Sequence, residues 1–194
     1  MQASWWADFR ASVGYEHFAI ILRHEGVILG GALVQKFPWA DGNCFYYIQE
    51  GPVLPKDESD AAEVFSAIIN GIEDHRRNGT ETISHLRIEP RWPRMRDFAT
   101  GFKPTKINDT YFEPRTTLCV EVRPSDEVIL NQMKPKGRYN IRVAQRHGVS
   151  VVEDNSDRGL ADFLRMYADM VKRQGINGKP AYYFETLLPI LWSV

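Results

Sequence analysis

The strongest constraint on the fold is a pair of apolar runs joined by a short glycine-containing link. The runs are His17–His24 and Val27–Phe37, and Glu25-Gly26 separates them. Two such runs around a short turn predict an antiparallel β-hairpin. Gly30-Gly31 lies inside the second run, where glycine predicts a β-bulge or the close approach of another backbone. A hairpin with apolar residues needs further elements to cover it, so we expect a sheet packed against helices.

Similar patterns along the chain predict the remaining elements. Apolar and β-branched runs predict strands at 44–49, 82–88, 116–122 and 149–152, the third of them buried. Helical spacing and stop signals predict helices at 4–13, 57–78, 91–101, 126–134, 135–147, 156–174 and 182–194. Ser4 is expected to cap the first helix. Helices packed against a mixed sheet give an α/β (α+β) fold class.

Length and composition exclude several classes of protein. Of the 194 residues, 43% are hydrophobic and 12% are aromatic, which is enough for a packed core and excludes a disordered chain. No apolar run approaches the roughly 18 residues of a membrane span, and the start MQASWWADFR lacks a secretion signal. Cys44 and Cys119 lie in predicted strands, so buried free thiols in a reducing compartment are expected. These features predict a cytoplasmic protein.

A basic segment interrupts this balanced composition. No acidic residue occurs between Glu127 and Glu153, whereas the whole chain has a formal net charge of −1. The cations of the segment are Lys134, Lys136, Arg138, Arg142 and Arg146. The three arginines are spaced by four, so they form one stripe on a helix. A solvated helix face is one reading of the stripe, and a site for phosphates or RNA is the other.

Cofactor and metal motifs are missing from the sequence. The five histidines and two cysteines lack ligand-type spacing, and neither a G-x-S-x-G elbow nor a P-loop occurs. The predicted order of elements resembles the acetyl-CoA N-acyltransferase (GNAT-like) fold. The pyrophosphate loop of that fold, Q/R-x-x-G-x-G/A, lies between a strand and a helix. The nearest match, QRHGVS at 145–150, has the wrong last residue and follows a helix, so we expect no cofactor and no metal.

Six sequence features follow one another along the chain: QASWWADFRASVGY at 2–15, the hairpin with its Gly-Gly strand, Gly51-Pro52-Val53, LRIEP at 86–90, the basic segment, and RQGINGKPAYYF at 173–184. In this order they resemble the Fem family of peptidyl and aminoacyl transferases, which build the peptidoglycan interpeptide bridge from aminoacyl-tRNA. The resemblance implies two acyltransferase-like domains. Residues 1–123 would form the first, 124–148 a helical connection, and 149–194 the beginning of a second, incomplete domain. Because the family's second domain is longer, this chain resembles the N-terminal part of such an enzyme.

The resemblance also implies roles for individual residues. Arg10, where relatives commonly have Lys, and Lys179, where a related type has Arg, would contact the diphosphate of the precursor. Tyr183 would hydrogen-bond the same precursor. Glu89 would lie near the acceptor amine as a general base, although an ion pair with neighbouring arginines is the simpler reading of this carboxylate. The segment from Lys134 to Arg146 would hold the tRNA through its phosphates.

The implied function is transfer of an amino acid from aminoacyl-tRNA to the stem-peptide amine of a peptidoglycan precursor. The expected partners are aminoacyl-tRNA and either UDP-MurNAc-pentapeptide or a lipid-linked precursor, with peripheral contact at the inner membrane face. Two alternatives stay open at this point. One is a fragment that binds a phosphate-rich ligand without turnover, and the other is an N-acyltransferase that acts on a different amine.

Overall fold

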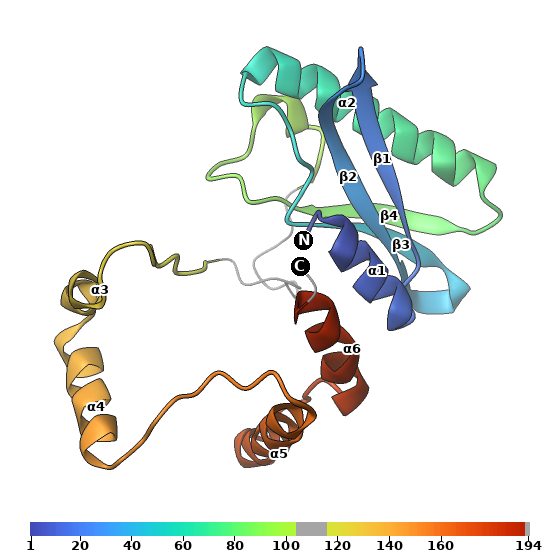
Figure 1. Ribbon diagram of the computed structural model, residues 1–194. Helices are drawn as coiled ribbons and strands as arrows, with labels where there is room; N and C mark the ends of the chain where they lie inside the picture. Colours follow the sequence, from blue (N-terminus) through green and yellow to red (C-terminus); the bar gives the residue numbers. More distant parts are fainter. Residues whose placement is uncertain (104–115, 193–194) are drawn as a thin grey trace. The chain divides into compact units, whose positions relative to one another are not determined.

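The computed structural model describes residues 1–103 and 116–192 (Figure 1). The chain divides into two compact units. Unit 1 consists of Met1–Glu113 together with Lys179–Val194, and unit 2 consists of Pro114–Gly178. The first unit contains a sheet with helices on it, and the second consists of helices and extended segments. We describe each unit by itself.

Unit 1 is built on a mixed four-stranded sheet. Its strands are β1 (His17–His24), β2 (Val27–Pro38), β3 (Cys44–Gln49) and β4 (Ile83–Glu89), in the order β1-β2-β3-β4. The first three strands are antiparallel, and β4 runs parallel to β3. A short 3₁₀ turn, η1 (Ala40–Gly42), joins β2 to β3. The sequence predictions for all four strands are therefore confirmed, as is the mixed α/β class.

The glycines of the hairpin have the roles that the sequence predicts. Glu25 and Gly26 both have positive φ angles, 48° and 81°, as a type I′ turn requires. The β1–β2 register shifts between Leu22 and Arg23, which is the predicted irregularity. The other predicted feature, a close backbone approach, is also present. A Cβ atom on Gly30 would lie 2.6 Å from the carbonyl oxygen of Val53.

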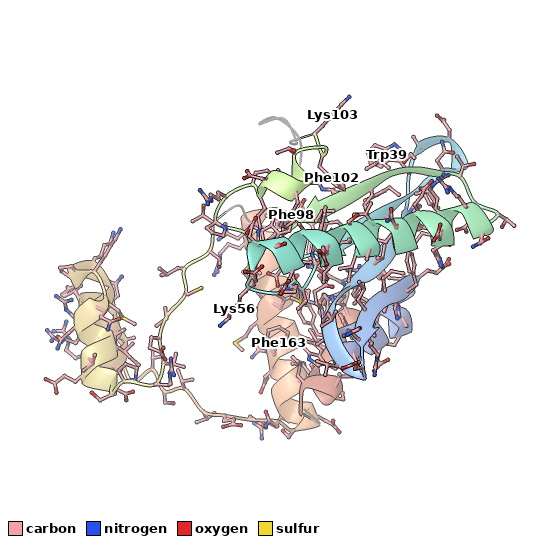
Figure 2. All side chains as sticks on the ribbon, turned by 90° about the horizontal axis from the view of Figure 1, so that it is seen from above. Trp39, Lys56, Phe98, Phe102, Lys103 and Phe163 are labelled. Carbon is pink, nitrogen blue, oxygen red and sulfur yellow. The ribbon has the colours of Figure 1, made fainter. Side chains whose placement is uncertain are left out.

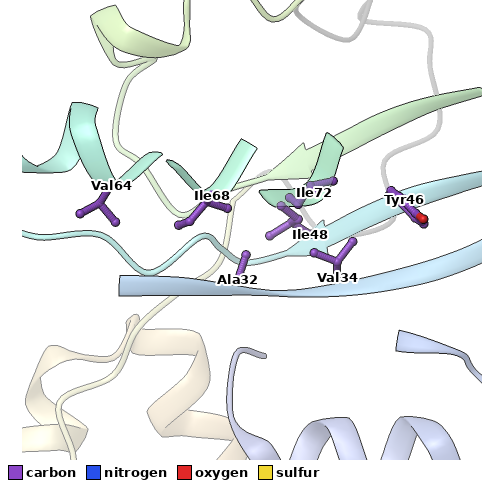
Figure 3. Close-up of a cluster of buried hydrophobic side chains, with 7 residues drawn as sticks. All are labelled: Ala32, Val34, Tyr46, Ile48, Val64, Ile68 and Ile72. Atoms are coloured by element: carbon purple, nitrogen blue, oxygen red, sulfur yellow. The ribbon is translucent and has the colours of Figure 1, made fainter. Parts of the chain in front are cut away.

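Helix α2 (Glu58–Asn78) covers one face of the sheet (Figure 1). Asp57 is its N-cap, and the carboxylate accepts hydrogen bonds from the amides of Ser59 and Asp60 at 2.9 and 3.2 Å. Figure 3 shows the α2 side chains above those of the central strands. The buried cluster contains Ala32, Val34, Tyr46, Ile48, Val64, Ile68 and Ile72. This cluster is the main core of unit 1.

Helices α1 (Ser4–Ser12) and α6 (Ala181–Trp192) both belong to unit 1 and contact each other. A second buried cluster forms around Trp6, Phe9 and Leu33, with apolar residues of α6 packed against it. Because side chains alternate along a strand, Leu33 lies on the sheet face opposite Ala32 and Val34. The prediction that Ser4 caps α1 is wrong, since Ala3 occupies the N-cap position and no side-chain bond caps the helix.

The prediction of a helix at 91–101 is also wrong. Only a 3₁₀ turn, η2 (Asp97–Ala99), forms there. Pro93 interrupts the segment, and a proline disfavours helical geometry in the residue before it. Aromatic side chains hold the segment against α2 instead, because Phe98 and Phe102 lie 5.1 and 5.7 Å from the Phe65 ring, between ring centres (Figure 2).

Unit 2 contains α3 (Asp126–Gln132), α4 (Pro135–Arg146) and α5 (Asp157–Gln174). These three helices match the sequence predictions, but none of them has a buried residue. The strands predicted at 116–122 and 149–152 are wrong, since neither segment has strand structure. Leu118 is 87% exposed and Val151 is 94% exposed. A β-prone run becomes a strand only when another strand pairs with it, and no described strand pairs with these two.

The cysteines follow the same division between the units. Both thiols are free, as predicted. Cys44, at the start of β3, is half-buried, whereas Cys119 is exposed. The prediction of a buried thiol is wrong for Cys119 because the strand expected around that residue does not form.

Candidate functional site

Arg10 is a buried cation on α1. It lies beside Trp6 and Phe9, and only 6% of its surface is exposed, so it is not a surface charge. Its Nε donates a 2.7 Å hydrogen bond to Oε1 of Gln35, and its guanidinium carbon lies 3.4 Å from the centre of the Tyr15 ring. Within the described residues, no carboxylate forms an ion pair with Arg10. The side chain is therefore held in one place without neutralisation of its charge by those residues.

Two buried glutamines extend this polar network, and neither was predicted from the sequence. Gln35 is 1% exposed and Gln49 is 8% exposed, and Nε2 of Gln35 donates to Oε1 of Gln49 at 3.4 Å. Gln2 links the network to the backbone, since its amide accepts from the Leu33 N–H and donates to the Gln49 carbonyl, both at 2.6 Å. The sequence did contain a signal for this network, namely a glutamine within an otherwise apolar strand. A buried amide at such a position needs hydrogen-bond partners nearby.

The contact between α1 and α6 brings together two motifs that are far apart in the sequence. The rings of Phe9 and Tyr183 meet edge to face, with centres 4.8 Å apart. Lys179 precedes α6, and its Nζ lies 5.3 Å from the centre of the Tyr183 ring. Arg10 follows Phe9 directly in α1. The opening motif and the G-K-P-A-Y-Y-F motif therefore meet where α1 contacts α6. Three of the predicted site residues thus belong to one region of unit 1.

Glu89, at the end of β4, is held by an ion pair. Arg87 donates to Oε1 of Glu89 from Nε at 2.7 Å and also from Nη2. The hydroxyl of Tyr47 donates to Oε2 at 3.1 Å. The side chains of Arg87 and Glu89 are 18% and 14% exposed. The ion pair that the sequence offered as the simpler reading of Glu89 is therefore present.

A second carboxylate lies at the end of β3. Burial acts against ionisation of Glu50, but the Arg91 guanidinium and the N-terminal ammonium group outweigh it and lower the pKa of Glu50. Arg91 pairs with Glu50, and the ammonium group of Met1 lies 3.2 Å from the same carboxylate. Charge-assisted bonds of this kind hold the chain start beside the sheet.

The basic segment lies on α3, α4 and the turn between them, in unit 2. Arg138 donates to the carbonyls of Met133 and Asn131, which are the last orphan carbonyls of α3, so this cation is used to join the two helices. Further along α4, an open hollow with a volume of about 590 Å³ is lined by Tyr139, Arg142, Gln145 and Arg146. Tyr139 is 60% exposed and was not among the predicted site residues. Lys134 and Lys136 are exposed at the start of α4.

The structure was also searched for metal sites and for helices that could span a membrane. Among the residues that the structure covers, no group of three or more His, Cys, Asp or Glu side chains could hold a metal ion. In the same part of the chain, no helix combines the length and the apolar character needed to cross a bilayer.

The comparisons with known proteins identify the class of this protein. The family model described as the FemAB family matches residues 93–190, which is half of the chain. The chain therefore belongs to the FemAB family, as its sequence motifs indicated.

Individual proteins that are similar to this chain include two curated enzymes and one solved structure. Lipid II:glycine glycyltransferase of Staphylococcus aureus (strain MRSA252) is 24% identical over 214 residues, which cover 98% of this chain and 47% of the relative. The enzyme of the same name from strain NCTC 8325 / PS 47 has the same identity and coverage. The crystal structure of FemX is similar in fold, with a TM-score of 0.77 at 22% identity over 99% of this chain and 49% of FemX. The chain thus spans about half the length of the relatives it matches.

Proposed function

We propose that this chain contributes to an aminoacyltransferase that moves an amino acid from aminoacyl-tRNA to the stem-peptide amine of a peptidoglycan precursor. The observation that carries the proposal is the α1–α6 contact, which places Arg10, Lys179 and Tyr183 in one region of unit 1. Family membership and relatives named as glycyltransferases support the same reaction class. The chain spans about half the length of those relatives, so the proposal concerns a contribution to the activity.

The precursor carries a diphosphate, whether it is linked to a nucleotide or to a lipid. Arg10 and Lys179 would neutralise this group through charge-assisted hydrogen bonds, and the Tyr183 hydroxyl would add a further bond. The bond from Arg10 Nε to Gln35 fixes the guanidinium before any ligand arrives. A fixed cation loses less conformational entropy on binding than a surface side chain does, and this favours affinity.

The chemistry itself requires little from the protein. The amine attacks the ester carbonyl of the aminoacyl-tRNA, an amide bond forms, and the ester C–O bond breaks. The ribose oxygen leaves with the proton that the amine gives up. An ester is already an activated acyl donor, so the protein mainly positions the reactants and stabilises the oxyanion. We keep Glu89 as a proposed base, and its activation would require the Arg87 pair to open.

The remaining parts of the proposal concern architecture and location. The sheet of unit 1 would be of the acetyl-CoA N-acyltransferase type, and residues 149–194 would begin a second domain of this type after the connection at 124–148. The basic segment would bind the tRNA phosphates. The protein would act in the cytoplasm, with peripheral contact at the inner membrane face where lipid-linked precursors lie.

Calorimetric titration with UDP-MurNAc-pentapeptide tests the precursor site, with acetyl-CoA as the competing ligand. We expect Lys179→Ala to weaken muropeptide binding by about 10- to 100-fold, because a charged hydrogen bond contributes about 1.5–3 kcal/mol. Arg10→Lys keeps the charge that relatives commonly carry and should bind better than Arg10→Met. Lys56→Ala is the matched control, since Lys56 is an exposed lysine that precedes α2 (Figure 2).

Two results would contradict the proposal. Unchanged muropeptide affinity in both Lys179→Ala and Arg10→Met would mean that these two cations do not bind the diphosphate. Binding of acetyl-CoA in place of the muropeptide would indicate an acyl-CoA enzyme that acts on a different amine. Circular dichroism of each variant shows that the fold is retained.

A further inference from the structure

Arg10 is surrounded by neutral groups. Its guanidinium carbon lies 3.4, 5.7 and 5.8 Å from the centres of the Tyr15, Phe37 and Trp6 rings. Among the described residues, the Gln35 amide is the one group that accepts a hydrogen bond from this side chain. Aromatic rings attract a cation without neutralising it, and an amide carries no charge. The surroundings therefore hold the cation in place and leave its charge uncompensated.

Carboxylates of the neighbouring elements are paired with other cations. Glu16, between α1 and β1, lies 2.5 Å from Nζ of Lys36. Glu89 of β4 pairs with Arg87. Burial of a charge without a counter-ion carries a free-energy cost, and only 6% of Arg10 is exposed. Such departures from the rules of packing are expected at functional sites, so Arg10 fits a cation whose charge an anionic ligand completes.

The bond to Gln35 uses Nε of Arg10 and leaves both Nη groups unused. Neither Nη atom bonds a described residue, and neither is among the fully buried polar atoms that lack a partner, so both reach the protein surface. The Tyr15 ring covers one face of the guanidinium, and the Tyr15 amide donates to the Arg10 carbonyl at 2.9 Å. A ligand therefore meets the edge of the guanidinium plane, where two N–H donors point in parallel.

We propose that Gln35 and Tyr15 are positioning residues, which present the Nη edge of Arg10 to one phosphate group and leave the charge of Arg10 unneutralised. This inference rests on the proposed function, in which that phosphate belongs to the precursor, and it deepens it by naming the residues that act through Arg10. Two parallel N–H donors match two oxygens of one phosphate, so the arrangement requires a guanidinium, and an ammonium group in its place would bind as a point charge.

The neutral amide of Gln35 is the decisive feature of this arrangement. Its Nε2 donates to Oε1 of Gln49 at 3.4 Å, and its oxygen accepts the bond from Nε of Arg10. In Gln35→Glu the carboxylate would accept the same bond, but its charge would also neutralise the guanidinium. The ligand would then compete with an internal carboxylate. In Gln35→Met the charge would stay uncompensated, but the acceptor that orients it would be missing.

Calorimetric titration of the whole chain with UDP-MurNAc-pentapeptide tests the inference, together with thermal unfolding without ligand. Gln35→Glu should weaken binding by about 10- to 100-fold, because a charged hydrogen bond to the ligand is lost. Gln35→Met should weaken it by about 3- to 10-fold, because only the ordering of one side chain is lost. Of the two variants, Gln35→Glu should nevertheless melt at the higher temperature, since it keeps the acceptor for Arg10 and pairs a buried charge.

Two further variants complete the set. Tyr15→Leu should weaken binding by about 2- to 10-fold, and Tyr15→Phe, which keeps the ring, should recover this loss. Gln132→Glu makes the same change of charge at the exposed end of α3 and is the matched control, which should alter neither affinity nor melting temperature.

Other outcomes overturn the inference. If Gln35→Glu both melted higher and bound more tightly than Gln35→Met, Gln35 would only support the fold. An equal loss of affinity in Gln132→Glu would mean that the added charge acts on the ligand at long range. Wild-type affinity in Gln35→Glu, with binding lost in Arg10→Met, would contradict this inference and leave the proposed function standing. Wild-type affinity in Arg10→Met would contradict the role of Arg10 itself, and the proposed function would fail at this residue.

Discussion

The two units use similar sequence patterns with different results. In unit 1, α2 places Ile68 and Ile72 against the sheet with 0% and 3% exposure. In unit 2, α5 has an equally regular apolar stripe, yet Phe163 is 37% exposed and no residue of α5 is buried. The difference lies in the partner, because α2 covers a paired sheet, whereas the described residues of the unit that contains α5 form no sheet.

This comparison also separates two kinds of cationic site. Arg10 is fixed within a packed network in unit 1, and its position depends on Gln35 and Tyr15. Arg142 and Arg146 lie on an exposed helix, where the sequence spacing alone sets their arrangement. A substitution in the first site is therefore expected to disturb both stability and binding, and one in the second site only binding.

The largest expected effect comes from the core of unit 1. Ile68→Ala should lower the free energy of unfolding by about 2–5 kcal/mol, because it leaves a cavity at a fully buried position. Leu118→Ala, at 87% exposure in unit 2, should change it by less than about 0.5 kcal/mol. Urea unfolding followed by tryptophan fluorescence measures both. Similar losses in the two variants would mean that residues 116–122 are packed in solution.

Several local features follow from short stretches of sequence, although the cap expected from Ser4 does not form. Asp57 caps α2, and Glu25-Gly26 supplies the two positive φ angles of the hairpin turn. Ser156 caps α5 by accepting from the Gly159 N–H at 3.2 Å. Each of these features depends on a few neighbouring residues, so the composition of a short segment is enough to predict it.

Long-range features were harder to predict. The runs at 116–122 and 149–152 have strand composition, but strand formation depends on a partner that their own sequence does not specify. The burial of Arg10 follows from the packing of α1 on the sheet, and the Gln35–Gln49 contact follows from the β2–β3 pairing. Tyr139 was not predicted as a site residue because charge alone marks that segment, although the sequence shows it three positions before Arg142.

A smaller effect separates the two cationic sites. Arg10→Met should destabilise the protein by about 1–3 kcal/mol, because it removes the bond to Gln35 and leaves a buried amide oxygen without its partner. Arg142→Met should change stability by less than about 0.5 kcal/mol, since this side chain is exposed. Thermal unfolding of both variants without ligand checks the pair. A loss in Arg142→Met as large as that in Arg10→Met would mean that α4 packs in solution.

The smallest expected effect is a pH dependence from His85. Burial, with a further contribution from the Arg87 charge, lowers the pKa of this imidazole below its ordinary value of 6.5, and the ring is stacked on Phe45 with centres 4.9 Å apart. A lowered pKa means that the unfolded chain binds the proton more tightly than the folded one. His85 therefore favours the folded state fully above about pH 6.5, and this contribution is lost as the pH falls through the lowered pKa.

Because the His85 residue is exposed, its contribution to the free energy of unfolding should be below about 0.5 kcal/mol. An NMR titration of the imidazole gives the direction of the pKa shift. Urea unfolding at about pH 5.5 and about pH 7.5 gives the stability difference, which His85→Phe should reduce while keeping the stacked ring. A His85 pKa above 6.5 would contradict this reading, because it would mean that in solution a carboxylate outweighs both the burial and the Arg87 charge.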